Sequence, residues 1–212
     1  MSVSPSQDVI YFNRLHFPVT TLGYGRRLGL WVQGCSIHCP GCIAPDTWHR
    51  KAEHALPIKL LLRAVERWLT DTDGVTISGG EPFDQPQALS RLLSELRQRC
   101  AGDLLVYSGY SFAHLRQNFA PILDQLDLVV SGPYVERLTD QRAYVGSSNQ
   151  EIHLLTKLAQ ERYQEIPTGR IGFGVSLQDN TLYLAGVPGR GTIPAVLAEL
   201  AKENILGKLA NE

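Results

Sequence analysis

Short apolar runs alternate with helical patterns along the first two thirds of this chain, and this alternation constrains the fold more than any other feature. Four runs are rich in branched or aromatic residues and lead into glycine, serine or proline, which predicts strands at Leu28–Val32, Val75–Ile77, Leu104–Tyr107 and Leu128–Val130. Strands separated by helices form βαβ units, in which the strands are parallel. We therefore expect an α/β fold.

The segments between these runs have the period of a helix. Apolar residues recur at i, i+3, i+4 and i+7 in residues 58–69 and 89–96, and more loosely in residues 112–122. Pro121 lies inside the third segment, where its ring and missing N–H are expected to kink or end the helix. Three helices are therefore predicted between the four strands.

The last third of the chain has a different pattern. Arg170–Ser176 and Thr181–Ala185 flank Gln178-Asp179-Asn180, which predicts a hairpin, and a helix with apolar residues on one face follows from about residue 193. The segment Gly132–Gln150 shows little periodicity, and a connection of that length is typical of a lid or binding loop. We expect a single domain over residues 1–212, built as a partial (β/α) barrel with a C-terminal β-hairpin and helix.

Composition excludes several classes of protein. The net charge of −1 gives no bulk attraction to nucleic acid or to an anionic membrane. No apolar run approaches the roughly 20 residues that a membrane-spanning helix needs, and Met1–Asp8 lacks the apolar core of a signal peptide. Four cysteines, three of them crowded together, are unlike a secreted disulfide framework. We expect a cytoplasmic protein with neither nucleic acid nor membrane as a partner.

Three cysteines follow the first predicted strand with the spacing C-x3-C-x2-C. They are Cys35, Cys39 and Cys42, and we expect them to be metal ligands. Three thiolates this close together can hold three irons of a [4Fe–4S] cluster and leave the fourth iron without a protein ligand. An open iron can bind a small molecule, so this spacing favours a reactive cluster over one that only stores electrons.

Two other interpretations of the cysteines are open. A structural zinc site needs a fourth ligand, for which His38 and Cys100 are the candidates. His38 is adjacent to Cys39, which makes a shared metal awkward, and Cys100 falls on the apolar face of the second predicted helix. A redox pair of Cys39 and Cys42 leaves Cys35 without a role. The open cluster is the favoured interpretation.

Polar, glycine-containing segments follow the other three predicted strands. They are Ser78-Gly79-Gly80-Glu81-Pro82, Ser108-Gly109-Tyr110 and Ser131-Gly132-Pro133-Tyr134. Glycines expose the backbone to a ligand because they have no Cβ, and a glutamate can accept a hydrogen bond from an ammonium group. The carboxyl ends of parallel strands share one rim, where β/α barrels build their active sites. The four segments therefore predict one site.

The cysteine motif with a downstream Gly79-Gly80-Glu81-Pro82 resembles the radical S-adenosylmethionine (SAM) superfamily. Within it, the chain resembles the activating enzymes of glycyl radical enzymes, first those of anaerobic ribonucleotide reductase and second those of pyruvate formate-lyase. The segments that carry the resemblance run in family order from about residue 20 to residue 134: Trp31-Val-Gln-Gly-Cys35, Cys42-Ile-Ala-Pro-Asp46-Thr47-Trp48, Ser78 to Pro82, Tyr107-Ser-Gly-Tyr110 and Asp127-Leu-Val-Val-Ser131-Gly-Pro-Tyr134.

The resemblance implies that SAM binds the open iron of a [4Fe–4S] cluster. The backbone of Gly79 and Gly80, with Glu81, would receive the amino group of SAM, and Ser108 and Ser131 would provide further contacts. Relatives usually carry an acidic residue at the position of Ser131. The cluster and SAM carry the chemistry in this family, so no catalytic side chain is expected.

The resemblance also implies a reaction and its partners. One electron, from a flavodoxin- or ferredoxin-type donor, would cleave SAM to methionine and a 5′-deoxyadenosyl radical. That radical would take a hydrogen atom from a glycine of a glycyl radical enzyme such as anaerobic ribonucleotide reductase. Two alternatives remain: a radical SAM enzyme that acts on a small molecule, such as a deazapurine synthase, and a non-catalytic binding module stabilised by metal.

Overall fold

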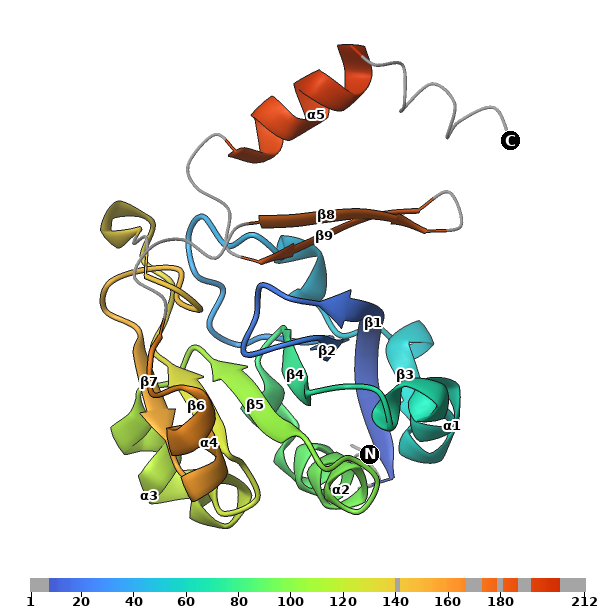
Figure 1. Cartoon of the computed structure of the whole chain (residues 1–212), viewed down its shortest axis with the longest axis vertical. Helices are drawn as coiled ribbons and strands as arrows, with labels where there is room; N and C mark the ends of the chain where they lie inside the picture. The colour runs from blue at the N-terminus through green and yellow to red at the C-terminus, as the bar shows by residue number, and fades with distance from the viewer. Residues whose placement is uncertain (1–7, 140–141, 167–172, 179–180, 187–191, 203–212) are drawn as a thin grey trace.

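The computed structural model describes residues 8–139, 142–166, 173–178, 181–186 and 192–202. Within these ranges, a seven-stranded sheet has the order β3–β1–β2–β4–β5–β6–β7, and a separate hairpin lies beside it (Figure 1). The seven-stranded sheet contains four parallel strands, which confirm the four predicted from the sequence: β2 (Arg27–Val32), β4 (Gly74–Gly79), β5 (Asp103–Ser108) and β6 (Leu128–Ser131). The chain is an α/β protein.

Three antiparallel strands of this sheet were missed by the sequence patterns. They are β1 (Val9–Val19), which pairs with β2 and with β3 (Ala55–Pro57), and β7 (Glu151–Leu154), which pairs with β6. β1 is partly exposed and its register with β2 is irregular, so its sequence shows no strict alternation. The sheet is mixed and has edges at β3 and β7, and closure into a partial barrel stays a prediction.

The three predicted helices are confirmed as α1 (Ile58–Leu69), α2 (Pro86–Arg97) and α3 (Phe112–Leu123). They lie along one side of the sheet (Figure 1), and their leucines share a core with Leu30 and Ile77 of the central strands. α3 is interrupted at Phe119, whose φ of −136° and ψ of 25° are not helical. Pro121 explains this kink because its ring clashes with the preceding turn.

The opposite side of the sheet has a second core. Leu105 and Val130 of the central strands pack there with residues 143–145 and with Ala159 of α4 (Lys157–Arg162), a short helix that the sequence analysis did not predict. Successive residues of a strand point to opposite faces, so each central strand is buried on both sides. This double burial explains why the central strands are continuous apolar runs.

A buried ion pair lies at the amino ends of the central strands. The Arg27 side chain is fully buried and its guanidinium is 2.7 Å from a carboxylate oxygen of Asp103. Arg27 also donates to the Thr76 hydroxyl at 2.6 Å, and Arg162 pairs with the other Asp103 oxygen at 2.9 Å. This network fixes the strands at the end opposite to the predicted site.

The C-terminal elements are β8 (Phe173–Gln178), β9 (Thr181–Gly186) and α5 (Thr192–Lys202), as predicted. The expected strand start at Arg170 and the turn residues Asp179 and Asn180 lie outside the described residues. Gly132–Gln150 contains a single turn of 3-10 helix, Glu136–Leu138, among its described residues, and its role as a lid stays a prediction. None of the helices in the described ranges has the length and apolar character required to cross a bilayer.

Candidate functional site

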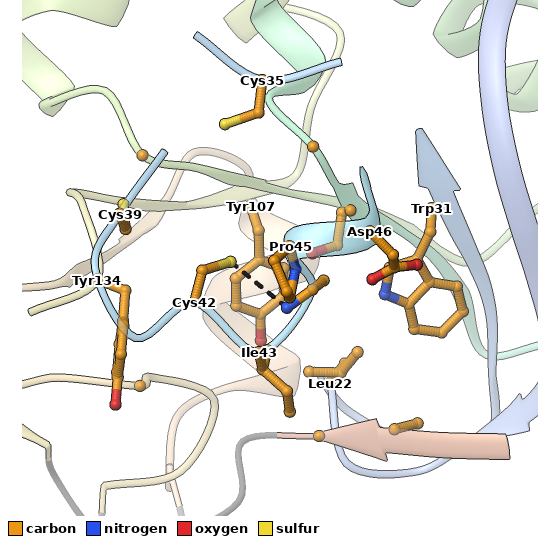
Figure 2. A pocket seen from close by; sticks show the side chains of 18 of the residues that line it. Leu22, Trp31, Cys35, Cys39, Cys42, Ile43, Pro45, Asp46, Tyr107 and Tyr134 are labelled. Carbon is orange, nitrogen blue, oxygen red and sulfur yellow. Dashed lines mark hydrogen bonds between the residues drawn. The ribbon is translucent and has the colours of Figure 1, made fainter. Parts of the chain in front are cut away.

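One cavity of about 950 Å³ opens at the carboxyl ends of β2, β4 and β5, as the rim argument predicted (Figure 2). Its size is at the upper end of the range for small-molecule sites. The structure brings all the predicted site residues to this cavity except Ser131; those that line it are Cys35, Cys39, Cys42, Gly79, Gly80, Glu81 and Ser108.

The three cysteines lie on one loop whose base is closed by backbone hydrogen bonds. Gly34 donates to the Thr47 carbonyl at 2.7 Å, and Cys35 donates to the Trp48 carbonyl at 3.0 Å. The Gln33 side chain reinforces the closure by donating to the carbonyls of residues 46 and 49. The Asp-Thr-Trp segment of the sequence therefore forms the closing side of the loop that holds the cysteines.

The donor set of this loop fits an iron–sulfur cluster. Cys35, Cys39 and Cys42 are free and half-buried, and Figure 2 shows their side chains around one part of the cavity. Burial raises the pKa of the Cys35 and Cys39 thiols, so without metal neither is activated as a thiolate. In a cubane cluster each cysteine binds a different iron, so the sulfurs surround the cluster instead of converging on one point.

The geometry does not favour a single zinc ion. Among the described residues, no three histidine, cysteine, aspartate or glutamate side chains converge as one ion requires. The His38 ring stacks on Trp48 with centroids 4.7 Å apart. Cys100 is 3% exposed in the core beneath α2 and does not line the cavity, which confirms that it is a core residue.

Gly79 and Gly80 bring two loops of the rim into backbone contact. Gly80 donates to the Val32 carbonyl at 2.9 Å, and Glu81 donates to the Gly34 carbonyl at 2.8 Å. A Cβ on Gly80 would stand 2.1 Å from the oxygen of Gly34, which no side chain can tolerate. The glycines therefore allow the loop after β4 to approach the cysteine loop closely. The sequence analysis had predicted another reason for them, the close approach of a ligand to the backbone.

The Glu81 carboxylate links the loops after β4 and β5. It is 1% exposed and accepts hydrogen bonds from the Phe83 amide at 3.0 Å, the Gly109 amide at 2.7 Å and the Ser108 hydroxyl at 2.9 Å. Burial raises the pKa of Glu81 to about 7 despite these three donors. The structure gives Glu81 a positioning role, and direct contact with an amino group of SAM stays a prediction.

Ser131 is the predicted site residue that does not line the cavity. Its hydroxyl lies 3.0 Å from Nε2 of His153, whose ring stacks on Phe112 at the start of α3 with centroids 3.6 Å apart. Ser131 pairs with Ser108 of the neighbouring parallel strand, so the two side chains point to the same face of the sheet. Ser108 and Gly132 both line the cavity, so Ser131 lies beside it and its contact with SAM stays a prediction.

A polar contact beside the cysteine loop was missed by the sequence analysis. Asp84 accepts hydrogen bonds from the Ser36 amide at 2.7 Å, the Ser36 hydroxyl at 3.0 Å and the Tyr110 hydroxyl at 2.7 Å. It therefore ties the cysteine loop to the loops after β4 and β5. The position of Asp84, three residues after Glu81 on the same rim, is the only sequence signal for it.

Comparison with known families agrees with this geometry. The family model described as "4Fe-4S single cluster domain" matches residues 21–153. The chain belongs to this iron–sulfur family. The match includes the cysteine loop and the rim segments after β4, β5 and β6, and it ends within β7, so α4, the β8–β9 hairpin and α5 lie beyond it.

Several curated relatives of this chain carry the same name. The anaerobic ribonucleoside-triphosphate reductase-activating protein of Escherichia coli K12 is 32% identical over 150 residues, which cover 66% of this chain and 96% of that protein. The protein of the same name from phage T4 is 26% identical over 134 residues, covering 61% and 85%. The predicted relationship to the activating proteins of anaerobic ribonucleotide reductase is confirmed.

A solved structure, that of QueE from Escherichia coli, is similar to part of the chain. Its TM-score is 0.43 at 18% identity, and the match covers 49% of this chain and 54% of that one.

Proposed function

We propose that this protein activates a glycyl radical enzyme, an anaerobic ribonucleoside-triphosphate reductase, by radical SAM chemistry. One observation carries the proposal: three free cysteines and the Gly79–Gly80 backbone line one cavity. Family membership and the reductase-activating relatives support it. A role for metal in folding alone would not require glycine backbone and cysteines to share a cavity of this size.

In this proposal, the cysteines, the glycines and the Glu81–Ser108 pair have different roles. Cys35, Cys39 and Cys42 would bind three irons of a [4Fe–4S] cluster, and the Gly79–Gly80 backbone would orient the amino group of SAM. Glu81 and Ser108 hold that backbone in place through their mutual hydrogen bond of 2.9 Å. The reduced cluster, when bound, supplies the electron that breaks the bond between C5′ and sulfur of SAM.

The reaction balances with one external electron. A flavodoxin- or ferredoxin-type donor would provide it, SAM would supply methionine and the 5′-deoxyadenosyl group, and the hydrogen atom would come from Cα of the partner's glycine. The products are 5′-deoxyadenosine and a glycyl radical. Apolar residues of the cavity wall, among them Leu22 and Trp31, exclude water from the radical.

The test is the anaerobic formation of 5′-deoxyadenosine. Protein reconstituted with iron and sulfide, reduced with dithionite and supplied with SAM should form it, and Cys39→Ala should not. Cys100→Ala is the matched control, because this core thiol lies outside the cavity and its loss leaves the three ligands in place.

Addition of the reductase should then produce a glycyl radical signal in electron paramagnetic resonance. Product from Cys39→Ala at the wild-type level, or uptake of zinc without iron and sulfide by the wild type, would refute the proposal.

A further inference from the structure

The C-terminal hairpin provides a wall of the cavity. Leu182, Tyr183 and Leu184 of β9 line the same cavity as the three cysteines. The family model ends at residue 153, so this wall is built by a segment beyond the shared domain. A segment added at the active site can determine which substrate reaches it.

One face of the hairpin is fixed to the domain. Nε2 of the buried His16 lies 2.8 Å from the Ser176 hydroxyl, and the His16 ring stacks on Tyr183 with centroids 4.3 Å apart. Ala185, on the same face as Tyr183, is buried in a cluster that includes Leu22 and Trp31. These contacts hold the hairpin against β1 and β2, so its other face is presented in a defined position.

The other face is apolar and leads out of the cavity. Val175 of β8 pairs with Leu184 of β9, and directly paired residues of antiparallel strands point to the same side. Leu184 lines the cavity, whereas Val175 is 42% exposed. Val175, Leu182 and Leu184, which point to this one side of the hairpin, are here called the hairpin track.

We infer that the hairpin track binds the glycine-bearing segment of the partner enzyme, as an uncharged, extended peptide. This inference rests on the proposed function. The β9 residues that line the cavity, residues 182–186, include no charged side chain, so an uncharged segment can lie against them without leaving a charge unpaired. A small molecule needs only the cavity, whereas a segment of a large partner must enter from outside, and the track continues to the exposed Val175.

The test introduces a charge on the exposed part of the track. Val175→Glu changes an exposed side chain, and Leu60→Glu is its matched control because Leu60 is 51% exposed on α1 and does not line the cavity. Leu184→Ala is a second variant, which shortens a track residue without adding charge. The probe is an anaerobic ribonucleoside-triphosphate reductase, whose dissociation constant from the cluster-loaded protein is measured anaerobically by fluorescence anisotropy.

We expect Val175→Glu to raise this dissociation constant about tenfold, equivalent to roughly 1.4 kcal/mol. Leu184→Ala should raise it in the same direction, and Leu60→Glu should leave it unchanged. Formation of 5′-deoxyadenosine without reductase should equal that of the wild type in Val175→Glu and Leu60→Glu, whose side chains do not line the cavity. Unchanged reductase binding in Val175→Glu would overturn the inference.

Loss of reductase-independent 5′-deoxyadenosine with unchanged reductase binding would also overturn it, because the hairpin would then serve SAM and not the peptide. A wild type that binds the reductase but never cleaves SAM refutes the proposed chemistry instead. The dissociation constant of the reductase tests the hairpin track independently of SAM cleavage.

Discussion

Replacement of Glu81 by glutamine tests how burial and hydrogen bonding oppose each other at the centre of the site. One carboxylate oxygen accepts from Phe83 and Ser108, and the other accepts from the Gly109 amide at 2.7 Å. An amide nitrogen in the second position would face that N–H donor to donor. Protonated Glu81 has one donor of its own, its O–H, whereas the glutamine amide has two, so Glu81→Gln leaves one more buried donor without an acceptor than the protonated wild type. Such a donor costs about 1–3 kcal/mol.

The pKa of Glu81 makes this loss depend on pH. Burial raises it from 4.5 to about 7 in the folded protein, so between these values the native state holds a proton that the unfolded state has released. Wild-type stability therefore falls as pH rises through this window, by about 1.4 kcal/mol per pH unit and about 3 kcal/mol in all. Glutamine does not titrate, so the deficit of Glu81→Gln should be largest near pH 5 and should vanish or reverse by pH 8.

The measurement is urea unfolding of the reduced, metal-free protein at several pH values between 5 and 8. The difference between wild type and Glu81→Gln removes the titration of every other group. Glu66→Gln is the control, because Glu66 is exposed on α1, and its effect should stay within about 0.5 kcal/mol at each pH. A deficit of Glu81→Gln that grows as pH rises would refute the reasoning, since it would mean that the three donors outweigh burial.

Three further variants test the surroundings of the site. Gly80→Ala places a methyl group 2.1 Å from a backbone oxygen and should cost about 1–3 kcal/mol in urea unfolding, with less iron bound after reconstitution. Asp84→Ala removes the acceptor of the Ser36 amide and hydroxyl, so the reconstituted protein should lose iron to a chelator faster than the wild type. Asp103→Ala leaves the fully buried Arg27 without its main partner and should cost about 3–5 kcal/mol, while SAM cleavage per bound cluster stays unchanged.

Much of the fold could be predicted because its central strands are buried on both faces. That burial makes β2, β4, β5 and β6 continuous apolar runs, and the helices between them show one apolar face each. Strand β1, which lies between β2 and the short edge strand β3, could not be recognised, because half-exposed positions accept polar residues and its irregular pairing breaks the alternation.

The candidate site divides in a similar way. Cysteine spacing and glycines after strands are local features, so Cys35, Cys39, Cys42 and the Gly79–Gly80 pair could be predicted to lie together. The partner of a single polar side chain at a strand end depends on tertiary packing, which is why Ser131 could be assigned to the rim while its contact with His153 could not be predicted.

The sequence alone determined the parallel core and the three thiols at its rim, because both follow from the spacing of residues close together in the chain. Only the tertiary structure decided that Glu81 binds a backbone amide 28 residues away and that His16 holds a hairpin 160 residues away. Such contacts depend on the register and packing of elements that are distant in sequence. No local pattern encodes them.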